Sequence, residues 1–186
     1  YENKTRYTVT PNTYPSALQS AMLFFFISML SSFTLTAQHQ EVHNYPKLAG
    51  HFGIIHPLVT FTKKETQANF DDSYTVGFPT GINILKSDKI GFSFEVVPFI
   101  KAQNKDSKME KLLFHPGVIF RCSRGFSFTA RAAFETNGRY GFTPVLTKTI
   151  KRNKDSSFYL SFVTPARFGN HSPTSLTMGL QIGIAF

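Results

Sequence analysis

Eight stretches with the character of β-strands follow one another between Leu48 and Phe186, and they constrain the fold of this chain more than any other feature. Each stretch is rich in β-branched and aromatic residues, and a polar connector separates it from the next. They cover residues 48–62, 73–86, 89–102, 110–122, 125–136, 139–151, 156–168 and 174–186. Asn137-Gly138, between two of them, is a typical hairpin dipeptide. The pattern predicts an all-β fold in which each strand pairs with the next.

Within the stretches, large apolar residues alternate with small or polar ones. In 125–136 one face carries Phe126, Phe128, Ala130, Ala132 and Phe134, whereas the other carries Ser127, Thr129, Arg131, Ala133 and Glu135. In 89–102, Ile90, Phe92, Phe94 and Val96 alternate with Gly91, Ser93 and Glu95. Strict alternation places one set of side chains on each face of a sheet.

An even number of antiparallel strands joined in sequence can lose its exposed edges by closing into an up-and-down barrel. In water the apolar face of such a barrel points inward, as in lipocalins, whereas in an outer membrane it points outward to lipid. The twelve lysines after residue 37 lie in connectors or near strand ends, with Lys148 the least peripheral. We therefore expect an eight-stranded transmembrane barrel, with a soluble lipocalin-like ligand-binding barrel as the alternative.

The composition agrees with a folded chain without membrane-spanning helices. Phe is unusually frequent, with 21 copies and no Trp, in a chain that is 41% hydrophobic. No uninterrupted apolar run reaches the roughly 18 residues that a spanning helix requires. The single cysteine, Cys122, excludes an internal disulfide.

The longest apolar run, residues 22–37, has the length of an export signal and ends on a small residue, Ala37, where a signal peptidase would cut. On this interpretation residues 1–21 are an upstream or non-native extension, residues 38–47 form a short periplasmic segment, and residues 48–186 form the barrel. The alternative is an uncleaved amphipathic or core helix at 22–37.

The last strand ends on an aromatic residue that four alternating apolar residues precede: Met178, Leu180, Ile182 and Ile184, then Phe186. This arrangement resembles the assembly signal of Gram-negative outer-membrane β-barrel proteins, although many of them carry a second aromatic where this chain has Ile184. In architecture the chain is similar to the small OmpA/OmpX-like eight-stranded type. The resemblance implies location in the bacterial outer membrane, contact with its lipid and recognition by the barrel-insertion machinery, but no particular activity.

Six of the eight stretches contain a proline: Pro57, Pro79, Pro98, Pro116, Pro144 and Pro165. Because proline cannot donate a ladder hydrogen bond, we expect bulges or kinks at these positions, or strands shorter than the stretches.

Strand phase points Glu95, Arg131 and Glu135 into the barrel, and it also allows Arg121 and Arg167 to point inward. The interior of an eight-stranded barrel is only wide enough for side chains, so these charges should pair. We expect Glu95 to pair with Arg131 and Glu135 to pair with Arg167, which would plug the lumen. The alternative is that the charges are solvated separately at the two rims.

No catalytic, cofactor-binding or metal-binding set emerges from the spacing of Ser, His and acidic residues. His56 and His115 each precede a proline on a strand, and we expect structural hydrogen bonds from them rather than catalysis. The basic connectors lack a nucleic-acid recognition element. The sequence thus favours a non-enzymatic membrane barrel with a structural or surface-interaction role. A narrow channel and an outer-membrane lipid-modifying enzyme remain alternatives.

Overall fold

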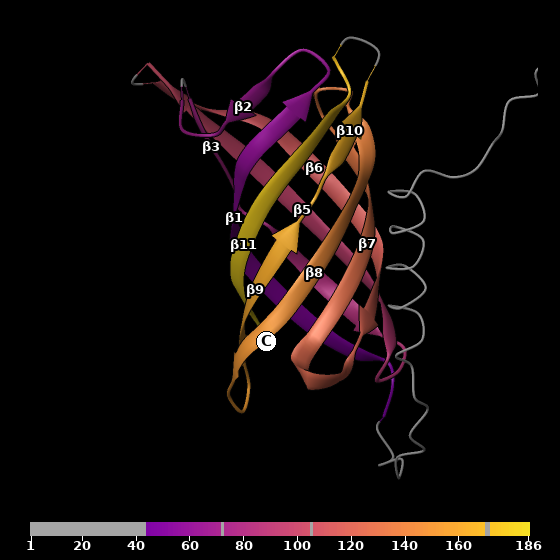
Figure 1. Cartoon of the computed structure of the whole chain (residues 1–186). Helices are drawn as coiled ribbons and strands as arrows, with labels where there is room; N and C mark the ends of the chain where they lie inside the picture. The colour runs from indigo at the N-terminus through magenta and orange to yellow at the C-terminus, as the bar shows by residue number, and fades with distance from the viewer. Residues whose placement is uncertain (1–43, 72, 105, 170–171) are drawn as a thin grey trace, which may run out of the picture. The chain divides into compact units, whose positions relative to one another are not determined.

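The computed structural model describes residues 44–71, 73–104, 106–169 and 172–186. The predicted export signal, its cleavage after Ala37 and the extension at 1–21 lie outside the described residues. The described part is an antiparallel β-sheet of eleven strands with one short 3-10 helix, η1 (Ser123–Gly125), so the all-β prediction is confirmed (Figure 1). The strands are β1 (Lys47–Thr62), β2 (Thr66–Ala68), β3 (Tyr74–Gly77), β4 (Thr80–Leu85), β5 (Ile90–Gln103), β6 (Asp106–Arg121), β7 (Phe126–Glu135), β8 (Tyr140–Arg152), β9 (Ser157–Val163), β10 (Ala166–Phe168) and β11 (Ser175–Ala185).

The strand pairings run in a ring. From β5 to β9 each strand pairs with the next, β9 and β10 both pair with β11, and β3 and β4 both bridge β1 and β5. The remaining contact is between the first and the last strand: β1 pairs with β11 from His51↔Ala185 to Thr62↔Ser175. We call the space inside this ring the lumen.

Two of the expected strands are interrupted, which corrects their predicted extents. The stretch 73–86 is divided into β3 and β4 at Pro79, and the stretch 156–168 is divided into β9 and β10 at Pro165. The expected connector 63–72 also contains a strand, β2, which folds back on the end of β1. The sheet therefore has more strands than the eight stretches, although they follow the same path along the chain.

The other prolines leave their strands continuous. Pro57 lies where the register between β1 and β11 shifts, as expected of a bulge. Pro98, Pro116 and Pro144 lie inside β5, β6 and β8, and Pro144 pairs with Ala130 without a register shift.

The Asn137-Gly138 turn is longer than a two-residue hairpin. The Glu135 N–H donates to the Arg139 carbonyl over 2.8 Å, so three residues lie between this bonded pair. Gly138 has φ 84°, a left-handed conformation that glycine adopts without strain and that is typical of three-residue hairpin loops.

Side chains alternate between the lumen and the outer surface as the sequence predicts. Along β7 the apolar face of Phe126, Phe128 and Phe134 is exposed, whereas Arg131 and Glu135 are buried. β5 follows the same rule, with Ser93 and Glu95 buried and Phe92 exposed. The polar set of each strand therefore faces the lumen.

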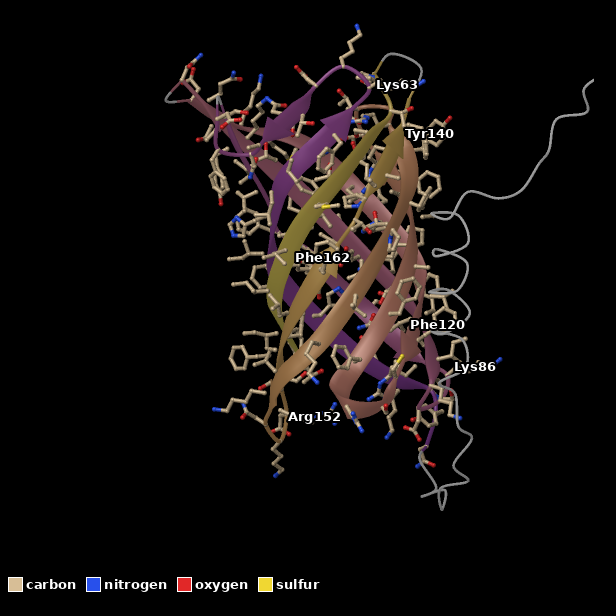
Figure 2. All side chains as sticks on the ribbon, in the orientation of Figure 1. Lys63, Lys86, Phe120, Tyr140, Arg152 and Phe162 are labelled. Carbon is tan, nitrogen blue, oxygen red and sulfur yellow. The ribbon has the colours of Figure 1, made fainter. Side chains whose placement is uncertain are left out.

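The outer surface carries a large number of exposed aromatic side chains, each with 37–54% of its surface accessible. On the strands these are Phe52, Phe61, Phe92, Phe114, Phe120, Phe126, Phe128, Phe134, Tyr140, Phe142, Phe158 and Phe162. In Figure 2, Phe120 and Phe162 lie on the wall between the two ends, whereas Lys63 lies near one end and Lys86 and Arg152 lie near the other. The apolar residues thus form the wall, and these charged residues lie beyond it.

Candidate functional site

The lumen contains a group of buried ionisable side chains that meet because their strands are in register. His51 on β1 pairs with Gly81 on β4, Gly81 pairs with Glu95 on β5, and Glu95 pairs with His115 on β6. Because Gly81 has no side chain, His51 can reach across it to Glu95. A Cβ atom at Gly81 would lie 2.7 Å from both the Glu95 Cβ and the His51 Cε1, too close for any other residue at this position.

Glu95 is the shared acceptor of this group. Its Oε1 lies 2.8 Å from His115 Nδ1, and its Oε2 lies 3.1 Å from His51 Nε2 and 3.3 Å from Arg131 Nη2. Arg131 also donates to the Ser93 hydroxyl over 3.0 Å. All of these side chains are buried, so the carboxylate has exchanged water for protein donors.

A second acidic group lies further along the lumen. Glu135 accepts a hydrogen bond from Arg167 Nε over 2.8 Å and from Lys111 Nζ over 3.0 Å. Arg167 also donates to the Thr143 hydroxyl over 3.0 Å and to the carbonyls of Phe142 and Ala166. This guanidinium is held by several acceptors at once.

The two groups are joined through Thr143. His115 Nε2 lies 2.9 Å from the Thr143 Oγ1 that accepts from Arg167. With the His115 proton on Nδ1, every link has a donor and an acceptor: Arg167 donates to Thr143, Thr143 to His115, and His115 to Glu95. We call the connected set the lumen network: His51, Ser93, Glu95, Lys111, His115, Arg131, Glu135, Thr143 and Arg167.

Of the five charged residues expected in the lumen, the structure brings four together in the expected pairs, Glu95 with Arg131 and Glu135 with Arg167. Arg121 stands apart. It lines the cavity described below and makes no ion pair among the described residues. The sequence pattern did not single out His51, Lys111 and Thr143 as members of the lumen network. Strand alternation places these three side chains on the lumen face, but it does the same for many residues that are not part of the network.

The order Thr143, His115, Glu95 has the connectivity of a hydroxyl nucleophile, a base and an orienting carboxylate. However, the Thr143 side chain is only 2% exposed and its oxygen already accepts from Arg167. A nucleophile must reach a substrate, and this hydroxyl is enclosed. As described, the arrangement is therefore a buried chain of hydrogen bonds rather than an accessible nucleophile. Across the described ranges, no group of three or more His, Cys, Asp or Glu side chains could hold a metal ion.

Apolar side chains occupy the lumen beside the network. Val97, Phe99, Leu113 and Ala133 form a buried cluster, with Ile55 packed against it. Together with the lumen network, this cluster fills part of the lumen.

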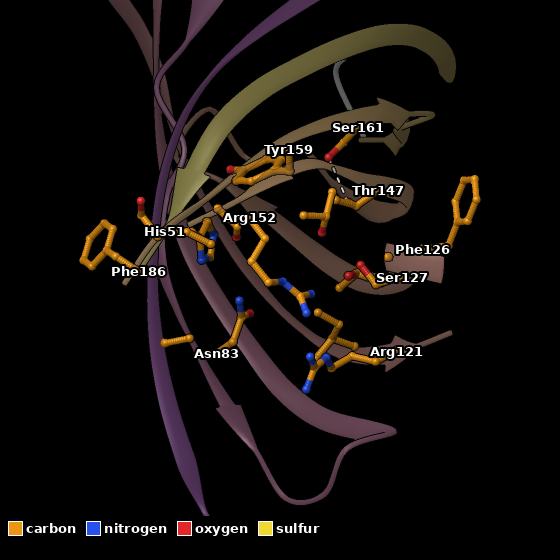
Figure 3. A pocket seen from close by; sticks show the side chains of 18 of the residues that line it. His51, Asn83, Arg121, Phe126, Ser127, Thr147, Arg152, Tyr159, Ser161 and Phe186 are labelled. Carbon is orange, nitrogen blue, oxygen red and sulfur yellow. Dashed lines mark hydrogen bonds between the residues drawn. The ribbon is translucent and has the colours of Figure 1, made fainter. Parts of the chain in front are cut away.

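Towards the end of the ring where β1 begins and β11 ends, the lumen opens into a cavity of about 570 Å³ (Figure 3). We call it the terminal cavity. Its wall includes His51, Asn83, Arg121, Thr147, Arg152 and Tyr159. Some hydroxyl groups on the wall have protein partners: Thr147 shares a hydrogen bond with Ser161 over 2.8 Å, and the Tyr159 oxygen accepts from the Gln181 amide over 3.1 Å.

The residues of the expected assembly signal lie on one face of β11 and at its end. Met178, Leu180, Ile182, Ile184 and Phe186 are all exposed, between 37% and 66%. Phe186 exchanges two backbone hydrogen bonds with Gly50, of 2.7 and 2.9 Å, at the seam where the last strand meets the first. The alternating apolar residues therefore belong to the outer surface.

Two solved structures show a weak similarity to this chain, and both are of de novo designed transmembrane β-barrels. The first has a TM-score of 0.45 and 11% identity, and the match covers 77% of this chain and 97% of the design. The second, solved by NMR, has a TM-score of 0.40 and 12% identity, with coverage of 76% and 93%. No protein-family model and no curated protein matches the chain. No helix among the described residues is long and apolar enough to span a membrane.

Proposed function

We propose that this chain is an integral outer-membrane protein of a Gram-negative bacterium whose eight-stranded transmembrane barrel has a filled lumen and a non-enzymatic role in envelope structure or surface interaction. The observation that carries the proposal is the inverted distribution of side chains. Buried positions hold charged and polar residues such as Glu95, Arg131 and His115, whereas the outer wall is made of Phe, Ile and Leu. A water-soluble barrel requires the opposite arrangement.

The pairing ring supports the eight-strand count. Taking β3 with β4, and β9 with β10, as interrupted strands, and β2 as an extension on β1, leaves eight positions around the ring. Exposed large hydrophobic side chains are present on strands all around this ring, whereas a soluble monomer rarely exposes large continuous apolar patches.

The packing of the lumen favours a structural role over a channel. A channel would need a hydrated path past Glu95 and His115, which are 3% exposed. Glu95 is bonded to His115 and Arg131, and His115 is bonded to Thr143 as well. The proposal includes two further steps. The protein is exported by a signal at residues 22–37, which is cleaved after Ala37, and the barrel-insertion machinery recognises the terminal segment Met178–Phe186.

Expression from Met22 in a Gram-negative host tests the proposal. We expect the protein in the outer-membrane fraction, and we expect its mobility in SDS gels to change on boiling because a folded membrane barrel resists SDS. Phe162→Lys, in the outer wall, should reduce the folded fraction, since a lysine facing the middle of a bilayer costs about 2–4 kcal/mol. Asn137→Lys, in a turn, is the matched control and should fold as the parent does. Recovery of the parent as a soluble protein would contradict the proposal.

A further inference from the structure

The terminal cavity has a strongly basic wall. Five basic side chains line it, whereas the acidic side chain on its wall is that of Asp155. The basic residues are Arg121, Arg124, Arg131, Arg152 and Lys154. Arg131 is paired with Glu95, but the other four make no ion pair with any described residue. Positive charge that is confined in a hollow with protein walls attracts anions more strongly than the same charge on an open surface.

Two of these unpaired residues are directed into the hollow from different strands. Arg121 ends β6 and Arg152 ends β8, and in Figure 3 both guanidinium groups extend into the space between the walls. Guanidinium groups present a planar set of donors that match the oxygens of phosphate, often in bidentate fashion.

The inner part of the cavity contains buried polar atoms without a partner. His51 Nδ1, Asn83 Oδ1 and Arg131 Nε are buried and form no hydrogen bond, and all three residues line the cavity. The His51 and Arg131 side chains are only 5% and 7% exposed. Buried polar groups in native proteins are normally satisfied, so the inner wall is short of hydrogen-bond partners, although these three atoms are themselves enclosed and do not face the open space.

We propose that the terminal cavity binds a small phosphate monoester, with Arg121 and Arg152 holding the phosphate. A volume of about 570 Å³ falls within the range of small-molecule sites and exceeds the need of a bare phosphate ion. The nearby hydroxyls of Ser127, Thr147 and Tyr159 suit a polar ester group. The cavity lies inside the ring, so the proposal does not depend on the membrane location of the barrel.

Calorimetric titration of the full chain, folded in a non-ionic and phosphate-free detergent, tests this site. Two probes separate the sources of such an ester: glycerol phosphate represents a free metabolite, and dioctanoyl phosphatidic acid represents a lipid headgroup. We expect saturable binding of at least one probe. If both probes bind, the site recognises the phosphate group whatever it is attached to. If only phosphatidic acid binds, the ligand is a lipid headgroup.

The double variant Arg121→Gln/Arg152→Gln should weaken this binding by about tenfold or more, because two charge-assisted contacts to phosphate are lost. Lys63→Gln/Lys64→Gln removes the same charge at the opposite end of the ring and is the matched control, with an affinity expected within about twofold of the parent. Circular dichroism and gel mobility verify that each variant is folded. Absence of saturable binding of both probes to the parent, or an unchanged affinity in the arginine double variant, would overturn the proposal.

Discussion

At the scale of single residues, Glu95 determines whether the lumen is stable. Its two carboxylate oxygens face His51, His115 and Arg131 within 2.8–3.3 Å, and none of these side chains is more than 7% exposed. A buried charge is tolerated when it is paired, but it becomes costly once its partner is removed. Arg131 therefore depends on Glu95 as its buried counter-ion.

Replacing Glu95 with alanine should destabilise the folded protein by about 3–5 kcal/mol, because Arg131 would remain buried without its counter-ion. Thermal unfolding in detergent, followed by circular dichroism, measures the change. Glu110→Ala is the control, since Glu110 is exposed on β6 and its replacement should leave the unfolding temperature nearly unchanged. A Glu95→Ala protein as stable as the parent would show that the lumen charges do not depend on one another.

The ion pairs of the lumen were predictable from the sequence, and so was a hydrogen-bonding role for His115, but the contact of His51 with Glu95 was not. Alternation alone indicates that Glu95 and Arg131 face inward, and a narrow interior obliges them to pair. The contact of His51 with Glu95 depends on the pairing of β1 with β4 and on the missing side chain at Gly81 between them. Register between strands distant in sequence is not contained in the local pattern of either strand.

At the scale of strands, the prolines show how a closed sheet accommodates residues that cannot donate. Pro79 separates β3 from β4 and Pro165 separates β9 from β10, yet the pairing continues across both breaks. The carbonyl of Pro79 accepts from Gly53 N–H over 2.9 Å, and that of Pro165 accepts from Thr177 N–H over 2.9 Å. The sequence predicted irregularity at six prolines, but not which of them would end a strand. That outcome depends on whether the neighbouring strand needs the missing N–H.

Phe186 lies at the seam between β1 and β11, where its backbone exchanges two hydrogen bonds with Gly50. Phe186→Asp should lower the fraction of folded barrel, since it replaces the aromatic ring beside Gly50 with a charge and alters the expected assembly signal. The ratio of folded to unfolded bands in unboiled gels of outer membranes measures the effect. Phe70→Asp is a matched control, because Phe70 is 65% exposed and Phe186 is 66% exposed, but Phe70 lies outside the terminal strand. Equal folded fractions in the two variants would argue against a signal in β11.

At the scale of the whole molecule, the stability of the fold depends on which solvent the outer wall meets. The wall presents aromatic and aliphatic side chains around the ring, whereas the lumen presents charges, hydroxyls and amides. Near the ends, this apolar surface gives way to charged residues such as Lys63, Lys86 and Arg152 (Figure 2). Such a wall is stable when lipid covers it and prone to association when water does.

Because the chain contains no tryptophan, a single introduced one reports its own surroundings without background. Phe120→Trp and Phe162→Trp place the reporter on the outer wall, whereas Tyr159→Trp places it on the wall of the terminal cavity. The decisive measurement is fluorescence in vesicles whose lipids carry bromine atoms on their acyl chains. For a barrel whose outer wall faces lipid, we predict blue-shifted emission and strong quenching at positions 120 and 162, with little quenching at position 159. Water-like emission and no quenching at positions 120 and 162 would contradict it.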